Sequence, residues 1–152
     1  MGTAVSEYVR EGYREINRKL RYGKTHELAP QIIEELKTFE THRGTVYRGL
    51  TLDKSEISET FMVGRIYRDR GFMSTSTSKD TSQKFNALGL PLSRTDERSI
   101  TLVIESKTGK RVDIPVLQYG EGEVIFPPLT GFEVISTEMD GWEEYTIVLK
   151  EV

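Results

Sequence analysis

Two carboxylates separated by a single residue, Glu121 and Glu123, are the first candidates for chemistry in this 152-residue chain. On an extended strand, residues i and i+2 project to the same side, so both carboxylates would face one site. Two like charges held together cost free energy unless a cationic ligand or a catalytic role compensates for it. The alternative is an exposed turn with two solvated acids, which the flanking glycines Gly120 and Gly122 favour.

Two other segments carry polar groups that could act together with such a pair. The run Ser74–Ser78 holds only hydroxyl residues, and a hydroxyl can donate to a carboxylate and fix its rotamer. Arg48 and Gly49 lie in a strand-like segment, where a guanidinium could bind phosphate through two parallel hydrogen bonds and a glycine would allow a ligand to approach the backbone. Each segment also has a purely structural interpretation, as a loop that satisfies its own backbone and as a surface ion pair.

Composition excludes several classes of site. The chain has no cysteine, which rules out disulfide scaffolds, thiolate nucleophiles and cysteine-bound metals, and its two histidines, His26 and His42, make a histidine metal site improbable. We therefore expect no metal. No apolar run approaches the length of a membrane span, and no basic segment precedes an apolar one as in a secretory signal peptide. Hydrophobic residues make up 36% and charged residues 30%, so we expect one soluble domain over residues 1–152.

Acidic residues dominate the second half of the chain. Residues 112–149 contain no Lys or Arg but eight acids: Asp113, Glu121, Glu123, Glu133, Glu138, Asp140, Glu143 and Glu144. A solvated acidic face explains most such runs, whereas a surface that receives a cationic group is the more specific interpretation. The net charge of -3 argues against a general nucleic-acid-binding domain.

The elements that must position these groups follow from hydrophobic periodicity. Apolar residues at helical spacing predict helices over residues 4–22 and 30–39, with a short helix after Asp53. A helix is also expected over 78–88, followed by a loop over 89–96. Alternating or β-branched residues predict extended segments at 45–50, 71–76, 99–105, 123–128, 131–137 and 145–152, with a turn at Gly109. Helices come first and strands later, which predicts an α+β domain rather than alternating β/α units.

The order and spacing of the three polar segments resemble one enzyme family. Arg48, the segment Gly71–Ser76 and the stretch EGEVIFPPLTGFEV from Glu121 to Val134 resemble the Arg–Ser–Glu class of mono-ADP-ribosyltransferases. This class includes bacterial toxin domains and vertebrate arginine-specific ecto-enzymes, and the resemblance spans nearly the whole chain. It implies two roughly orthogonal, mainly antiparallel sheets, N-terminal helices packed alongside, and NAD as co-substrate bound in a cleft.

The resemblance also implies a role for each matching residue. Arg48 would hold the NAD diphosphate, and the Gly49 backbone would bind the nicotinamide amide. Ser74 would orient the catalytic Glu123 by a hydrogen bond. The remaining predicted NAD contacts are Thr75 and Ser76 beside Ser74, the aromatic Phe85, and the helix residues Tyr8, Tyr13 and Asn17.

A Glu rather than a Gln at position 121 goes with arginine acceptors in this class. A carboxylate there could pair with the acceptor guanidinium, align it and take its proton. The chain departs from toxin members at Leu88, where a second diphosphate-binding Arg is often found. Arg14, Arg18 and Arg21 on the first helix are candidates to replace it, and the sequence does not choose among them.

The resulting hypothesis is an arginine-specific mono-ADP-ribosyltransferase that modifies a target protein. It would be secreted or injected as a bacterial toxin or effector and act in the cytosol of the target cell, and a cognate immunity protein is expected if the target is a bacterium. An NAD glycohydrolase, which transfers ADP-ribose to water, is a second hypothesis. A catalytically silent binding module of the same fold is a third.

Overall fold

A computed structural model of the chain describes residues 3–79, 97–112, 122–140 and 144–152. The N-terminal helix is a continuous rod made of α1 (Thr3–Glu7), the π-helical turn η1 (Tyr8–Gly12) and α2 (Tyr13–Arg21). It ends at Gly23 (φ +76°), where Gly23 N–H donates to Leu20 O and Lys24 N–H donates to Lys19 O. This pair of bonds is a Schellman C-cap, and the helix predicted over 4–22 is confirmed.

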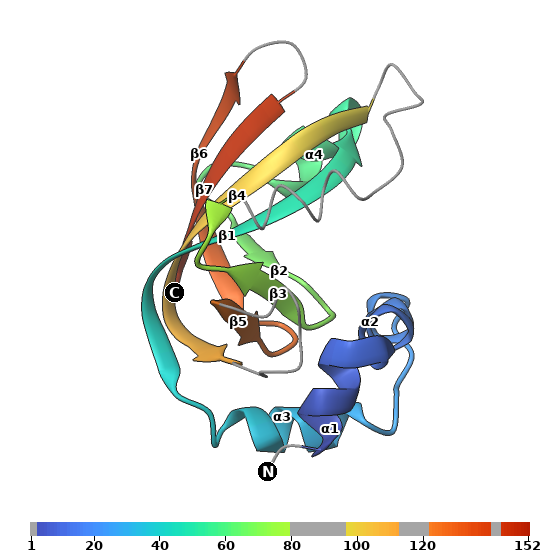
Figure 1. Ribbon diagram of the computed structural model, residues 1–152. Helices are drawn as coiled ribbons and strands as arrows, with labels where there is room; N and C mark the ends of the chain where they lie inside the picture. Colours follow the sequence, from blue (N-terminus) through green and yellow to red (C-terminus); the bar gives the residue numbers. More distant parts are fainter. Residues whose placement is uncertain (1–2, 80–96, 113–121, 141–143) are drawn as a thin grey trace.

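A second helix, α3 (Ala29–Leu36), has Pro30 in its first turn and covers most of the segment predicted over 30–39. It packs against α1, and its Glu35 carboxylate accepts hydrogen bonds from the backbone N–H groups of Ala4 (3.0 Å) and Val5 (3.1 Å). A side chain of one helix therefore satisfies the free amides at the start of the other. This contact fixes where the N-terminal helix begins relative to α3 (Figure 1).

The rest of the described chain is strand-rich. The seven strands are β1 (Thr41–Asp53), β2 (Ile66–Arg68), β3 (Met73–Ser76), β4 (Glu97–Arg111), β5 (Glu123–Phe126), β6 (Gly131–Asp140) and β7 (Glu144–Glu151), and helix α4 (Lys54–Thr60) follows β1. The predicted strands and the short helix after Asp53 are all present. The predicted helix over 78–88 lies almost wholly outside the described residues, and the loop over 89–96 lies fully outside them.

The turn predicted at Gly109 is wrong, because Gly109 lies inside β4. It pairs with His42 of β1. A Cβ atom at Gly109 would lie 2.6 Å from Val124 Cγ1 and 2.8 Å from Phe126 Cζ. The glycine therefore marks a close approach between β4 and the side chains of β5.

The strands pair in the order β1-β3-β5-β4-β7-β6-β2, and β1 also pairs directly with β4. All of these pairs are antiparallel except β4–β7. The long strands β1 and β4 reach from one part of the fold to the other, and the short strands β3 and β5 lie across them (Figure 1). The expected α+β class and mainly antiparallel pairing are confirmed.

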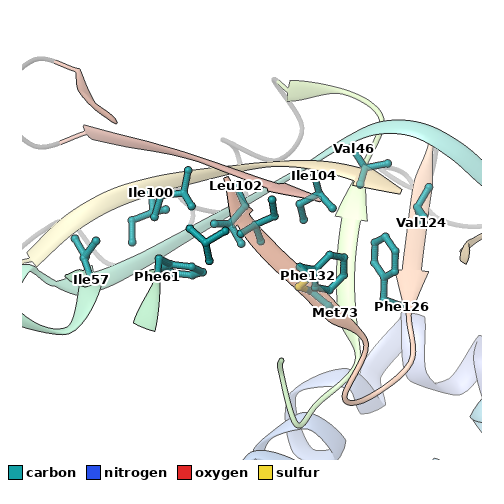
Figure 2. Packing of buried hydrophobic residues seen from close by; sticks show 13 residues of the cluster. Val46, Ile57, Phe61, Met73, Ile100, Leu102, Ile104, Val124, Phe126 and Phe132 are labelled. Carbon is teal, nitrogen blue, oxygen red and sulfur yellow. The ribbon is translucent and has the colours of Figure 1, made fainter. Parts of the chain in front are cut away.

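The main core lies between the long strands and the inner faces of β3, β5 and β6. Figure 2 shows Val46 and Ile104 from β1 and β4 packing over Val124 and Phe126 from β5. A second cluster lies between the N-terminal helices and the opposite face of β3 and β5, and it includes Tyr8, Ile16, Ile32, Phe72 and Ile125. Strands β3 and β5 thus alternate between a face toward the main core and a face toward the helices.

No helix among the described residues is long and apolar enough to span a membrane.

Candidate active site

The pairing of β3 with β5 brings two of the predicted segments together. Ser76 lies directly opposite Glu123, and Ser74 lies opposite Ile125. Residues that are directly opposite in an antiparallel pair project to the same face, and so do residues i and i+2 of one strand. Ser74, Ser76 and Glu123 therefore share the face of β3 and β5 that looks toward the N-terminal helix.

Tyr8 connects that helix to the serine face. Its hydroxyl lies 3.1 Å from Ser74 Oγ and accepts a hydrogen bond from Asn17 Nδ2 (3.0 Å), while Asn17 Oδ1 accepts the backbone N–H of Phe72 (2.8 Å). Burial raises the pKa of Tyr8, so its hydroxyl stays protonated. Tyr8 and Asn17 are 1% and 7% exposed, so in this structure they support Ser74 and β3 and are not open to a ligand.

The π turn makes this contact possible. In a straight α-helix each residue turns by about 100°, so residues nine positions apart, such as Tyr8 and Asn17, would point in opposite directions. The π turn over Tyr8–Gly12 inserts an extra residue into the helix and brings Asn17 round toward Tyr8. Tyr13 comes to lie next to Tyr8, with the ring centroids 6.4 Å apart, and is 39% exposed. Of the three predicted helix residues, Tyr13 is therefore the exposed one.

Arg48 reaches β3 from the neighbouring strand β1. Its Nη1 atom donates to the backbone carbonyl of Ser74 (2.9 Å), and it forms no ion pair with any carboxylate of the described residues. Gly49, its neighbour, lies inside β1 opposite Thr101 of β4. The guanidinium thus lies beside the serine face with no described carboxylate to compensate its charge, which suits an anion such as a diphosphate.

Glu123 begins β5 and is half-buried. Burial raises the pKa of its carboxyl from 4.5 to about 7. The expected hydrogen bond from Ser74 is absent, since Ser74 Oγ is engaged by Tyr8 and the carboxylate accepts no hydrogen bond from a described residue. Ser76 is the hydroxyl residue opposite it, although Ser76 Oγ accepts the N–H of Ser78 (3.0 Å). A half-buried carboxylate without partners is suited to meet a developing positive charge.

Thr75 lies on the other face of β3, so the expectation that it lines the NAD site does not fit its position. Its hydroxyl donates to the backbone carbonyl of Val124 (2.7 Å). This bond ties β3 to β5 from the side of the main core. Thr75 therefore holds the two strands together rather than facing a ligand on the serine face.

The residue before Glu123 has a fixed conformation. Gly122 has φ +73°, its carbonyl accepts the N–H of Thr77 (2.8 Å), and a Cβ there would lie 2.0 Å from Thr77 Oγ1. Only glycine fits this position without strain. Glu121 and Phe85 lie outside the described residues, as does Leu88.

Arg21, one of the candidates for a second diphosphate arginine, is already engaged. It donates to both carboxylate oxygens of Asp69, at 2.9 and 3.0 Å. The Oδ1 atom of Asp69 also accepts the backbone N–H of Gly71. Arg14 instead lies against Tyr13, donating to its hydroxyl (3.3 Å). Sequence reasoning missed Asp69, although Asp-x-Gly is a signature of a side chain that bonds the backbone two residues on.

The described residues contain no group of three or more metal-ligating side chains. The described residues of the site supply one half-buried carboxylate, hydroxyl groups and a guanidinium that donates to the Ser74 carbonyl.

The chain is similar to known proteins in sequence and in fold. Residues 2–150 match the family model described as ADP-ribosyltransferase exoenzyme. The chain is 30% identical over 133 residues to the NAD(+)–protein-arginine ADP-ribosyltransferase Tre1 of Serratia proteamaculans, covering 83% of this chain and 26% of that protein. It is 28% identical over 152 residues to a putative NAD(+)–arginine ADP-ribosyltransferase, Mav, of Mycobacterium avium, covering 95% of this chain and 17% of that protein. It thus spans only about a quarter and a sixth of these two relatives.

Solved structures show the same fold. The ADP-ribosyltransferase Vis, from Vibrio splendidus, in complex with agmatine superposes with a TM-score of 0.80 at 21% identity, over 98% of this chain and 72% of that one. Exoenzyme S of Pseudomonas aeruginosa, bound to carba-NAD, superposes with a TM-score of 0.75 at 16% identity, over 98% and 72% of the two chains. At these identities the likeness establishes the fold.

Proposed function

The chain belongs to the ADP-ribosyltransferase exoenzyme family, and on that premise we propose that it transfers ADP-ribose from NAD to the guanidinium of an arginine in a target protein. The main support is that two groups lie beside strand β3: the half-buried carboxylate of Glu123, and the guanidinium of Arg48, which forms no ion pair with a described carboxylate. Both curated relatives are named as arginine ADP-ribosyltransferases, and agmatine, the ligand of the Vis structure, carries a guanidinium.

NAD would be held mainly through its diphosphate. Arg48 supplies a positive charge that no described carboxylate neutralises, and it is kept in place by the Ser74 carbonyl. In this proposal the Gly49 backbone binds the nicotinamide amide, Ser76 lines the site beside Glu123, and Tyr13 is the helix residue that touches NAD. Phe85 is the proposed aromatic partner of the nicotinamide.

The first chemical step breaks the bond between ribose C1′ and the nicotinamide nitrogen. Nicotinamide leaves with the electron pair of that bond, and positive charge develops on the ribose. The ionised carboxylate of Glu123 accepts a hydrogen bond from the adjacent ribose hydroxyl and stabilises this charge, as glycosidase carboxylates do. The carboxylate must be ionised for this role, so its raised pKa bears directly on the activity.

In the second step a guanidinium nitrogen of the acceptor attacks C1′ and forms the new C–N bond. The attacking nitrogen must lose a proton, because a guanidinium is always charged and is a poor nucleophile. We assign Glu121 to pair with the acceptor and take this proton. The assignment rests on its position two residues before Glu123 in the sequence.

The test is incubation of the protein with NAD and agmatine, measuring both released nicotinamide and ADP-ribosyl-agmatine by mass spectrometry. Glu123→Gln is expected to abolish both products. Glu121→Gln is expected to abolish transfer while some nicotinamide release survives. Equal loss of both products in Glu121→Gln would contradict an acceptor role for Glu121. Nicotinamide release with no ADP-ribosyl-agmatine from the wild type would instead indicate an NAD glycohydrolase.

The family and the neighbours, which include the type III effector XopAI from Xanthomonas, support a bacterial toxin or effector. We propose that the protein is secreted or injected and acts in the cytosol of a target cell. If that cell is a bacterium, the producing strain needs a cognate immunity protein. Expression in the bacterial cytosol without such a protein is expected to arrest growth, and Glu123→Gln is expected to relieve the arrest.

A further inference from the structure

Arg21 and Asp69 join the end of helix α2 to the connection between β2 and β3. Arg21 Nε and Nη2 donate to the two carboxylate oxygens of Asp69, at 2.9 and 3.0 Å, and Nη2 also lies 3.4 Å from the carbonyl of Phe72. The Asp69 side chain is only 11% exposed. This two-point pairing is the strongest geometry available to an Arg and a carboxylate.

Helix α2 packs directly against the backbone segment that precedes Ser74. A Cβ atom at Gly71 would lie 2.9 Å from Asn17 Oδ1 and 3.0 Å from Arg21 Nε, and Gly71 N–H donates to Asp69 Oδ1 (2.8 Å). The Asp69 carboxylate is therefore held on the short segment that leads into β3. Three residues beyond Gly71, the carbonyl of Ser74 holds Arg48.

The charges of Asp69 and Arg48 both act on the hydroxyl group of Tyr67. Burial and the charge of Asp69 raise the pKa of Tyr67 to about 12, against the opposing effect of the charges of Arg48 and Arg21. The pKa of Tyr67 therefore depends on the charges of Asp69, Arg48 and Arg21. Arg21 Nη2 lies 3.4 Å from the carbonyl of Phe72, and Arg48 Nη1 donates to the carbonyl of Ser74 (2.9 Å), two residues further along the same segment. The Arg21–Asp69 ion pair therefore lies near the Arg48 guanidinium.

We propose that Arg21 is a positioning residue that neutralises Asp69, so that Arg48 keeps an uncompensated positive charge for the diphosphate of NAD. This inference rests on the proposed function. Without Arg21, the Asp69 carboxylate would repel the diphosphate and compete with it for Arg48. Arg21 would thus promote NAD binding without contacting NAD.

The test measures the Kd of NAD by calorimetry at low salt for four variants of the protein. Arg21→Gln is expected to weaken NAD binding by roughly tenfold, the size expected of one partly screened charge at this range. Asp69→Asn keeps an oxygen for Gly71 N–H, and it is expected to leave Kd unchanged or lower it. The double variant Arg21→Gln/Asp69→Asn is expected to return to within about twofold of the wild type, because the unpaired negative charge is gone.

Lys19→Gln is the matched control, since Lys19 on the same helix pairs with exposed Glu15 (3.4 Å) and its loss removes the same charge. It is expected to bind NAD like the wild type. A double variant that binds as weakly as Arg21→Gln, or an Arg21→Gln variant that binds like the wild type, would overturn the inference. If the wild type binds no NAD at all, the proposed function fails instead, so the two failures are distinguishable.

Discussion

Ser76 of β3 lies directly opposite Glu123, the first residue of β5. This register places the buried hydroxyl residue and the half-buried carboxylate on the face of the two strands that looks toward the N-terminal helix. On the same face, the Ser74 side chain is held by Tyr8, and the Ser74 carbonyl holds Arg48. The pairing of two four-residue strands thus organises the groups on which the proposed reaction depends.

Activity should rise with pH through neutrality. Because the pKa of Glu123 is raised to about 7, its ionised fraction grows roughly tenfold between pH 6 and pH 8. The measurement is kcat/KM for nicotinamide release across this range, since that ratio reports groups of the free enzyme. A profile that stays flat from pH 5 to pH 8 would show that the working pKa is not raised.

Glu123→Gln should make the protein more stable at high pH. The native state holds the Glu123 proton more tightly than the unfolded chain does, so ionisation costs stability as pH rises from 4.5 to about 7, and the cost is complete above that range. Urea unfolding at pH 8 should therefore show a gain of about 1–3 kcal/mol for the variant. Little gain is expected at pH 4.5, and an equal gain at both values would contradict the pKa argument.

Tyr8→Phe should lower activity with little loss of packing. The change removes the hydroxyl that meets Ser74 Oγ and Asn17 Nδ2 but keeps the ring against Phe72 (centroids 5.2 Å apart). We expect kcat/KM to fall by about tenfold, or about 1.4 kcal/mol, with a loss of about 1–2 kcal/mol in stability. Tyr22→Phe is the control for the loss of a hydroxyl, because Tyr22 is 78% exposed and has no role in the proposed site. If Tyr8→Phe keeps full activity, Tyr8 does not position Ser74.

Gly122→Ala should impair activity through the position of Glu123. Its positive φ costs an alanine about 1 kcal/mol, and the added methyl meets Thr77 Oγ1 at 2.0 Å. Gly64→Ala is a matched control, since Gly64 has φ +88° with no atom within 4 Å of the added carbon. Gly64→Ala should lose only the stability that a positive φ costs an alanine, and it should keep its activity. Gly122→Ala should lose more stability and most of its activity. Comparable effects of the two changes would refute a specific role for the Gly122–Thr77 contact.

Glu151 should matter for stability alone. It is 3% exposed, and its carboxylate accepts the backbone N–H groups of Lys107 (2.6 Å) and Thr108 (2.8 Å) as well as the Thr108 hydroxyl. Glu151→Gln loses part of this set, so we expect a loss of about 1.5–3 kcal/mol in urea unfolding with unchanged activity per folded molecule. Glu144→Gln, at an exposed position of the same strand, should change stability by less than about 0.5 kcal/mol.

Much of this architecture follows from local sequence patterns. The first helix and the central parts of the long strands β1 and β4 were predictable from their hydrophobic patterns. Strand β2 was missed, because three residues with one polar end give too short a pattern and its pairing with β6 is non-local. Gly109 was misinterpreted because a glycine between two strand-like runs has the same sequence signature in a turn as in a close approach.

The sequence proposed residues for the candidate site but could not predict the contacts among them. The spacing of Arg48, Ser74 and Glu123 identified the three groups through their resemblance to a family. That Ser76 rather than Ser74 faces Glu123 depends on strand register, which a short sequence does not encode locally. That Asn17 is buried and bonded to Tyr8 depends on the π turn, for which the sequence carries no recognised signal.

The most direct test of the central claim is to incubate the protein with labelled NAD and lysates, bacterial and eukaryotic, and to map the modified residue by mass spectrometry. We expect label on arginine side chains of a target protein, and none when Glu123 is replaced by Gln. Recovery of the label only on asparagine, cysteine or a nucleobase would contradict it.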